Sequence, residues 1–510
     1  MTRSVVAIAW RFLRRLPPGL RVLWRTLVWG FWLVYFSFIV LVLALRYSIL
    51  PNIENYRPLL ERLSSQEIGQ TVSIGHIEAS WHGINPDLTL YDVQVHDQEG
   101  RPALAFSRVD AILSWWSVPS AELKLRLLSI NDPTLHLRRD ASGRLHVAGM
   151  ALGDTQGQSG FTDWLLAQWR IRIRNATLVW DDELRQAPTL TLKALDFSLD
   201  NSGRRHRFGL TALPPEHLAS RLDLRGDLRS ASFKWLGGWS GTLFTELDYV
   251  DLAAWRQWVD YPLSLPHGRG ALRAWAGLSN GELHELTADL LLDDASFRLA
   301  RDLPPLDLQR MSGRLSVRFL TQGYALKGQR IALESAAGSH GNEAIRITPT
   351  DFQAEWQTGT GSSGKVNASQ LDLTALSRLA GHLPLDARSR QLLKDYAPRG
   401  RLRELSASWK GDAATLQTYA LKAGFEALAL KAQGNFPGFT GLSGTLEANE
   451  KGGSLNLLSQ ASSIDLPGVF PKSSPEPHTP LDSLKAQARW SMGQEGLKVE
   501  LQKMEFAGPE

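Results

Sequence analysis

The sequence predicts a mainly β protein that one N-terminal helix holds in a membrane. Three features support this fold class: a long apolar segment near the start, many short stretches in which apolar and polar residues alternate, and few stretches with helical periodicity. Alternation with a period of two places apolar side chains on one face of a strand. The Gly and Pro clusters between these stretches predict the turns of an antiparallel sheet.

The N-terminal segment has the length and composition of a membrane-spanning helix. Residues 26–45, TLVWGFWLVYFSFIVLVLAL, contain no charged side chain. A helix of this length spans roughly 30 Å, which matches the hydrocarbon core of a bilayer. A cleaved signal peptide is the alternative, but the apolar run exceeds its usual core, and Arg46 stands where small cleavage-site residues are expected. We therefore expect an uncleaved transmembrane helix.

The charges around this segment predict its orientation. The tail of residues 1–25 contains no acidic residue and six arginines: Arg3, Arg11, Arg14, Arg15, Arg21 and Arg25. Because positively charged flanks stay in the cytoplasm, the tail is expected there and the rest of the chain is expected to be exported. Setting these six aside, the 56 basic residues fall to 50, against 52 acidic ones. A body without positive excess argues against nucleic acid as a partner.

A short helix is expected beside the membrane, within residues 46–69. Ile53, Tyr56, Leu60 and Leu63 have helical spacing, and Gly69 is a plausible stop. Two roles remain open for this helix. It lies on the membrane surface, or it caps the first sheet.

The exported part consists mostly of predicted strands. The helical exceptions are residues 162–169, residues 251–259 and two pieces between Leu376 and Tyr396. So few helices cannot cover so much sheet, so the apolar strand faces must pack against each other or against something else. The clearest alternating stretches are residues 88–90, 122–127, 133–139, 143–147, 171–175, 195–200, 313–319 and 496–501.

The second half of the chain repeats itself. GALRAW at 270–275 is echoed by GRLREL from 400, and MSGRL at 311–315 by LSGTL at 442–446, with offsets of 130 and 131 residues. A third copy starts at PLDSLKAQARW, shortly before the chain ends, so we expect the sequence to be part of a longer protein. The predicted divisions are an N-terminal β region at 70–260, β modules at 261–399 and 400–479, and the start of a third module at 480–510.

No catalytic, metal or cofactor site is predicted. The chain has no Cys, and no two of its twelve His lie three, four or five residues apart. GTGSSGKV at 359–366 has most of the spacing of a nucleotide-binding P-loop. However, Val366 stands where the magnesium-binding Ser or Thr belongs, and both flanks alternate like strands. The stretch predicts a β-hairpin and no bound nucleotide.

Several segments, in order along the chain, resemble one known family. They include WHGINPDLTLYDVQVHDQEGRPALAFSRVDAILSWWS (81–117), DPTLHLRRDASGRLHVAG (132–149), FTDWLLAQWRIRIRNATLVWDD (161–182) and DLAAWRQWVDYPLSLPHGRGALRAW (251–275). Together they resemble the YhdP-type branch of the AsmA-like family over essentially the whole chain. The resemblance implies a Gram-negative envelope protein, longer than this chain, that is anchored in the inner membrane with its bulk in the periplasm.

The resemblance also implies a particular fold and function. The fold is an elongated, twisted antiparallel β-sheet bent into a groove with an apolar interior, along which phospholipid moves between the inner and outer membranes. No catalytic residue is implied. The expected partners are phospholipid, the inner membrane and outer-membrane components.

The lining of such a groove needs only a continuous apolar surface. We expect its residues to include Leu88, Leu90, Leu123, Leu125 and Leu127, with Lys124 and Arg126 on the opposite face. Judged from the residues alone, strands with alternating polarity more often form closed β-sandwich cores than an open groove. The alternative function is therefore an anchored envelope scaffold or assembly factor that binds protein. Open or covered apolar faces would distinguish the two.

Overall fold

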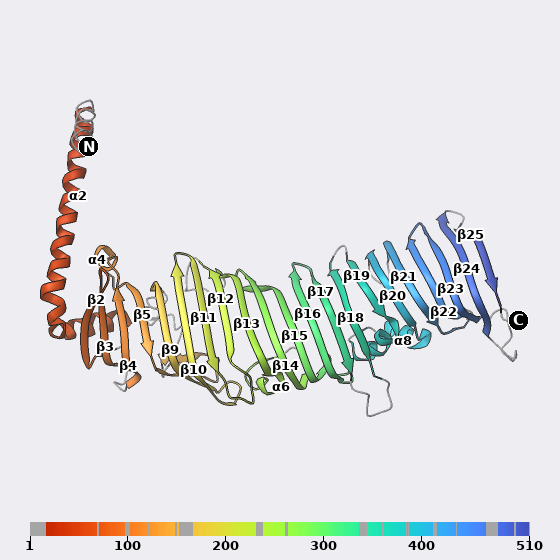
Figure 1. Ribbon diagram of the computed structural model, residues 1–510, viewed down its shortest axis with the longest axis horizontal. Helices are drawn as coiled ribbons and strands as arrows, with labels where there is room; N and C mark the ends of the chain where they lie inside the picture. Colours follow the sequence, from red (N-terminus) through yellow and green to blue (C-terminus); the bar gives the residue numbers. More distant parts are fainter. Residues whose placement is uncertain are drawn as a thin grey trace. The chain divides into compact units, whose positions relative to one another are not determined.

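Figure 1 shows the computed structural model of the chain. Its residues form two compact units, Met1–Pro133 with Asp154–Arg170 and Thr134–Gly153 with Ile171–Glu510. We describe each unit by itself. The structure describes all residues except 1–16, 69–70, 97–101, 121, 148–149, 152–166, 231–237, 261–263, 336–343, 360–361, 384, 386, 412–415, 435, 466–477, 494–495 and 509–510.

The first unit begins with the predicted membrane helix, α2 (Pro18–Ala44). Pro18 suits the first helical position because its missing N–H would have had no partner there. The chain continues without a break through η1 (Leu45–Ile49), η2 (Leu50–Tyr56) and α3 (Arg57–Ile68). Within the described part of the chain, this is the one helical stretch long and apolar enough to cross a membrane, and its apolar window is not buried.

The juxtamembrane helices cap the first edge of the sheet. The side chain of Glu61 accepts a hydrogen bond of 2.8 Å from the backbone N–H of Ile74, and Glu54 accepts one of 3.1 Å from that of Ile77. Strands β1 (Val72–Ser73) and β2 (His76–His82) form this edge. Because an open edge leaves backbone donors unpaired, these contacts support the capping role.

The rest of the first unit is an antiparallel sheet in which β2, β3 (Asn85–His96), β4 (Pro102–Leu113) and β5 (Leu125–Asn131) pair in order. A short helix, α4 (Ser117–Ser120), follows β4.

The second unit contains most of the strands. Its first three are β6 (Thr134–Arg139), β7 (Leu145–Val147) and β8 (Met150–Ala151), and β6 runs parallel to the end of β9. The remaining strands are β9 (Arg170–Asp182), β10 (Ala187–Ser202), β11 (Arg205–Leu213), β12 (Leu222–Arg229), β13 (Ser240–Asp251), β14 (Ser264–Ser279), β15 (Glu282–Arg298), β16 (Leu306–Leu320), β17 (Gly323–Ser335), β18 (Arg346–Gln357), β19 (Ser363–Asp372), β20 (Arg399–Lys410), β21 (Thr418–Leu430), β22 (Gly438–Asn449), β23 (Gly452–Asp465), β24 (His478–Gly493) and β25 (Gly496–Ala507).

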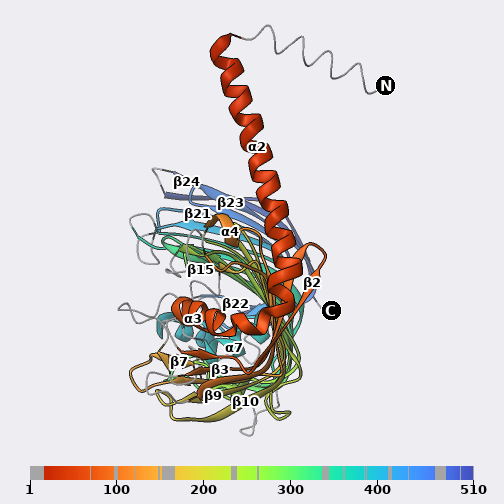
Figure 2. The same cartoon turned by 90° about the vertical axis from the view of Figure 1, so that its left-hand side faces the viewer.

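From β9 to β25 each strand pairs with the next one along the chain, and from β10 onward every pair is antiparallel. Seventeen strands at about 4.8 Å spacing measure roughly 75 Å across the sheet. The strands bend, and helix α7 (Leu373–Leu379) lies on their inner side (Figure 2). The described residues of this unit form one sheet, with no second sheet stacked on it.

Three short helices interrupt the strands where the sequence predicts them: α6 (Leu252–Trp255), α7 and α8 (Ala387–Tyr396). The side chains of Asp251 and Asp372 cap α6 and α7 by accepting hydrogen bonds from Ala254 N–H and Ala375 N–H. The helix expected at 162–169 begins outside the described residues.

The two repeat landmarks occupy equivalent strands. GALRAW lies in β14 and GRLREL in β20, and each of these strands follows a helix; MSGRL lies in β16 and LSGTL in β22, two strands later in both cases. This agrees with a duplicated module, while the module boundaries themselves stay predictions.

Candidate functional site

The register of the second unit assigns every strand residue to one of two faces, and one face carries an unbroken apolar row. Directly paired residues point to the same side of a sheet, so the row can be followed from strand to strand. It crosses sixteen strands without a polar side chain. We call this the first apolar row: Leu199, Phe208, Gly226, Leu243, Ala276, Leu286, Val317, Leu326, Ala354, Val366, Ala407, Leu421, Ala448, Gly453, Trp490 and Val499.

A second row on the same face lies two residues further along each strand. It crosses β10 to β20, and Thr245 is its one polar member. With two adjacent rows, the apolar surface is a band rather than a line. The second apolar row is Phe197, Leu210, Leu224, Thr245, Ala274, Ala288, Leu315, Gly328, Phe352, Ala368 and Leu405.

The opposite face is mostly polar, with one aromatic pair on β13 and β14, and charges on it are paired across strands. Arg273 Nε lies 2.6 Å from Glu246 Oε1, and Arg314 Nε lies 2.5 Å from Asp289 Oδ1. The Arg314 guanidinium holds the pKa of Asp289 below its ordinary value. This face is therefore stable in contact with water, and the two faces of the sheet differ in polarity.

The apolar face is open. Members of the first apolar row such as Val317 and Leu421 are half-buried, and Leu286 is 36% exposed. A second sheet stacked on this face would bury such side chains as a sandwich core does. The closed-sandwich expectation is therefore wrong for the part of the second unit that the structure describes.

Different groups border the two sides of the apolar face. On one side, Ala375 and Leu379 of α7 pack on a cluster that contains Leu308 and Leu333. Trp255 at the end of α6 and Trp258 just after it pack on a separate cluster in β9 to β11. The other side carries aromatic side chains, which we call the aromatic rim. Its members occupy one register line across β16 to β21: Phe319, Tyr324, Trp356, Trp409 and Tyr419.

The residues predicted from the sequence lie in the first unit, and the structure does not keep them on one face. Leu88 and Leu90 share a face with Leu125, because Leu88 pairs with Ala111 and Leu125 with Leu113. Leu127 pairs with Ile112 and therefore lies on the opposite face. The prediction of one shared face was wrong because the register shifts between these two pairs, and an extra residue in one strand exchanges the faces.

Two further details separate these leucines from an open surface. Leu123 precedes β5, so it lies outside the strand. Leu88 and Leu125 are buried in the core of the first unit. Their contact with lipid stays a prediction, and the half-buried apolar rows of the second unit are better candidates. The signal for those rows was present in the alternating stretch GRLSVRF (313–319), which contributes Leu315 and Val317 to them.

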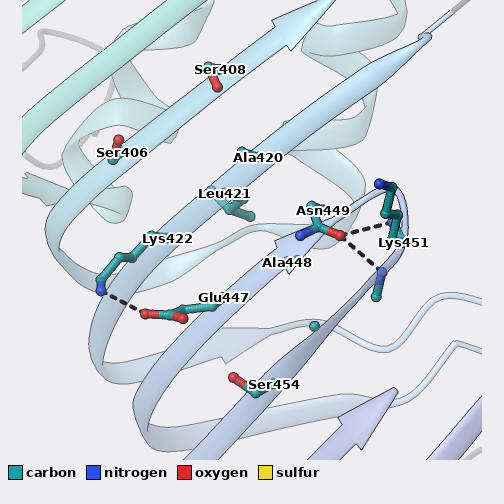
Figure 3. A pocket seen from close by; sticks show the side chains of 12 residues that line it. Ser406, Ser408, Ala420, Leu421, Lys422, Glu447, Ala448, Asn449, Lys451 and Ser454 are labelled. Atoms are coloured by element: carbon teal, nitrogen blue, oxygen red, sulfur yellow. Dashed lines mark hydrogen bonds and ion pairs between the residues drawn. The ribbon is translucent and has the colours of Figure 1, made fainter. Parts of the chain in front are cut away.

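The polar face contains a hollow of about 540 Å³ between β20 and β23 (Figure 3). Lys422 and Glu447 face each other across it at 2.6 Å, and Asn449 Oδ1 accepts hydrogen bonds from the backbone N–H groups of Lys451 and Gly452. Of its charged side chains, Lys422 and Glu447 are paired with one another.

The P-loop-like stretch forms the predicted hairpin. Lys365 lies in β19 and pairs with Glu355 of β18, and Val366 belongs to the first apolar row. Residues 360–361 at the turn lie outside the described residues. Among the residues that the structure describes, no group of three or more His, Cys, Asp or Glu is placed to hold a metal ion.

An apolar N-terminal helix and a long sheet with one open apolar face define a class of protein: one with a helix long and apolar enough to cross a membrane and a hydrophobic surface many strands wide. The chain belongs to the YhdP protein family, whose profile matches residues 1–510. It is similar to the protein described as "Intermembrane phospholipid transporter YhdP" from Escherichia coli (strain K12), with 22% identity over 475 residues. The match covers 90% of this chain and 35% of that protein. No solved structure matches the chain.

Proposed function

We propose that this chain carries phospholipid on the open apolar face of its second unit, as part of a bridge between the inner and outer membranes. The observation that supports this most strongly is the first apolar row, which stays apolar across sixteen paired strands. The transport activity in the name of the similar E. coli protein points the same way. A scaffold that only binds protein would need no such unbroken surface.

The energetics suit transfer rather than tight binding. Burying a methylene group is worth about 0.8 kcal/mol, so an acyl chain lying on the apolar band would keep much of the stabilisation that it has in the bilayer. No single side chain is required, only continuity. The aromatic rim suits the boundary between acyl chains and headgroups, because Tyr and Trp rings combine an apolar body with a polar group.

The orientation of the bridge is part of the proposal. The arginines before the apolar segment 26–45 favour a cytoplasmic tail, and the sheet would then lie in the periplasm. Phospholipid would then leave the inner membrane and travel toward the outer membrane. No step of this function requires a covalent bond to form or break, so we propose no enzymatic activity.

A pair of charges on the apolar face tests the proposal. Leu286 and Val317 face each other on neighbouring strands, and the next residues, Thr287 and Ser316, face each other on the opposite side. We expect the double variant Leu286→Asp/Val317→Asp to lose phospholipid transfer in the intact cellular protein. The matched control Thr287→Asp/Ser316→Asp introduces the same charges at the same spacing and should retain transfer.

Abundance, membrane association and protease resistance of both variants are measured alongside phospholipid transfer between the membranes. Normal transfer by a folded, anchored Leu286→Asp/Val317→Asp protein would contradict the proposal.

A further inference from the structure

One end of the first unit's sheet exposes a group of apolar side chains. Two segments meet there: the turn between β2 and β3, and the segment 114–120 that follows β4. We call them together the tip. Ile84 is 71% exposed, Trp116 is 63% exposed and Val118 is 58% exposed. Trp115 joins the two segments by donating a hydrogen bond of 3.2 Å from Nε1 to the carbonyl oxygen of Ile84.

The tip lies beside the membrane-spanning helix. The rings of Phe38 in α2 and Trp115 in the tip are 4.8 Å apart between centroids. Lower on the helix, the Arg46 guanidinium lies 5.7 Å from the ring centre of Trp81 in β2. Figures 1 and 2 show α4 next to α2. Strand β2 therefore runs along the helix toward its N-terminus, and the tip reaches further along it than Arg46 does.

These contacts place the tip at the depth of a lipid leaflet. Arg46 is the first charged residue after the apolar segment, and Phe38 precedes it by eight residues, or about 12 Å of helix. Half of a hydrocarbon core is about 15 Å thick. If Arg46 marks the bilayer surface, Phe38 and the tip beside it lie within the leaflet that holds the C-terminal half of α2.

The composition of the tip suits this depth. Residues 83–86 (GINP) and 111–121 (AILSWWSVPSA) contain no charged side chain, and two adjacent tryptophans stand at the centre of the longer segment. Trp is enriched where a protein crosses the membrane interface.

The backbone of the tip is also largely paired internally, as a segment in lipid requires. Ser114 N–H donates to the carbonyl oxygen of Lys124 at 2.9 Å, and Ser117 N–H donates to that of Ser114 at 3.0 Å. The Ser117 hydroxyl donates to the same Lys124 oxygen at 2.9 Å.

We propose that the tip inserts into the phospholipid leaflet that holds the C-terminal half of α2, with Ile84, Trp116 and Val118 among the upper acyl chains. The sheet of the first unit then starts inside the leaflet rather than above it. This proposal rests on the membrane anchor alone and holds whether or not lipid travels along the second unit.

Fluorescent labels report the depth directly, because the chain has no Cys and a single one can be introduced at will. The full chain carrying Trp116→Cys or Ile84→Cys is labelled with an environment-sensitive dye in vesicles of phosphatidylethanolamine and phosphatidylglycerol. We expect blue-shifted emission, quenching by nitroxides on the upper acyl chain and little quenching by aqueous iodide. A control, Gln94→Cys, is exposed on the same β3 strand about 30 Å from the tip and should be quenched by iodide.

A label at Val40→Cys, on the exposed surface of α2, separates two kinds of failure. Lipid quenching at residue 40 combined with iodide quenching at residues 84 and 116 would overturn the tip proposal and leave the anchor intact. Iodide quenching at residue 40 as well would overturn the anchor and the tip together.

Discussion

On the apolar face of the second unit, four aromatic rings lie over a glycine of the neighbouring strand. A side chain in place of any of these glycines would overlap the ring. Each ring can therefore lie flat on the sheet, which adds apolar area without raising a bulky group above the surface. The pairs are Phe208 over Gly226, Phe352 over Gly328, Trp409 over Gly364 and Trp490 over Gly453.

Replacing one such glycine tests whether the flat rings matter. We expect Gly328→Ala to displace the Phe352 ring into the space above the sheet, at a cost of about 1–3 kcal/mol for overpacking. Phospholipid transfer should fall because the displaced ring obstructs the apolar band. The measurements are transfer in cells and the thermal unfolding midpoint of the purified protein.

The control is Gly209→Ala on the polar face, where the added methyl group would stand 3.3 Å from Ser198 Oγ. The explanation fails if the two variants transfer lipid equally well.

An ion pair joins β6 to the end of β9. Arg139 donates to Asp182, with 2.9 Å between Nε and Oδ1, and the Asp182 side chain is 1% exposed. Burial by itself would raise the pKa of Asp182. The hydrogen bonds from Arg139 and from the backbone N–H of Arg185 outweigh that effect and hold this pKa below its ordinary value. The pair therefore stabilises the packing of β6 on β9 while the carboxylate is charged.

Removing the cation should loosen β6. In Arg139→Gln the buried carboxylate loses its charged partner, which costs about 3–5 kcal/mol. We expect faster hydrogen exchange of the β6 amides at pH 7. The sign follows from the lowered pKa: the stabilisation is present above about pH 4 and is lost as the pH falls through the pKa of the folded state. The difference from the parent protein should therefore shrink in acid.

Arg138→Gln is the matched control, because Arg138 forms an exposed ion pair with Glu183 that contributes little to stability. Equal exchange in both variants, or a difference that grows in acid, would contradict this account of β6.

Alternation predicts where the strands are much better than it predicts which face of the sheet each residue occupies. The stretches at 171–175 and 313–319 fall within β9 and β16, as expected. However, strand irregularities accompany residues with positive φ, such as Ala194, Asp294 and Glu404, and each exchanges the faces of the residues beyond it. A simple count of alternate residues misplaced Leu127 for the same physical reason.

At the scale of the whole molecule, the candidate site could not be located from the sequence. An alternating strand has the same pattern whether a second sheet or a ligand covers its apolar face. The pairing of the strands decides whether a second sheet or a ligand covers the face, and paired strands can lie far apart in the sequence. Leu243 and Val499 belong to one row although they are far apart in the chain. The resemblance to a family predicted the open face, and the register then identified its residues.

Orientation is a second property of the whole molecule. The six arginines before the apolar segment 26–45 predict a cytoplasmic N-terminus, so a reporter fused after residue 60 should be active only outside the cytoplasm. Alkaline phosphatase, active when exported, and a fluorescent protein that matures in the cytoplasm give opposite readouts at this position. Cytoplasmic activity would refute the export of the sheet, and the proposed function with it.

Photocrosslinking from both faces of the sheet tests the central claim most directly. Photoreactive residues are placed at Leu286 and Leu421, six strands apart in the first apolar row, and at their neighbours Thr287 and Lys422 on the polar face. We expect phospholipid adducts from positions 286 and 421 in living cells and none from 287 and 422. Absence of adducts at both apolar positions, or equal adducts from the two faces, would contradict the account.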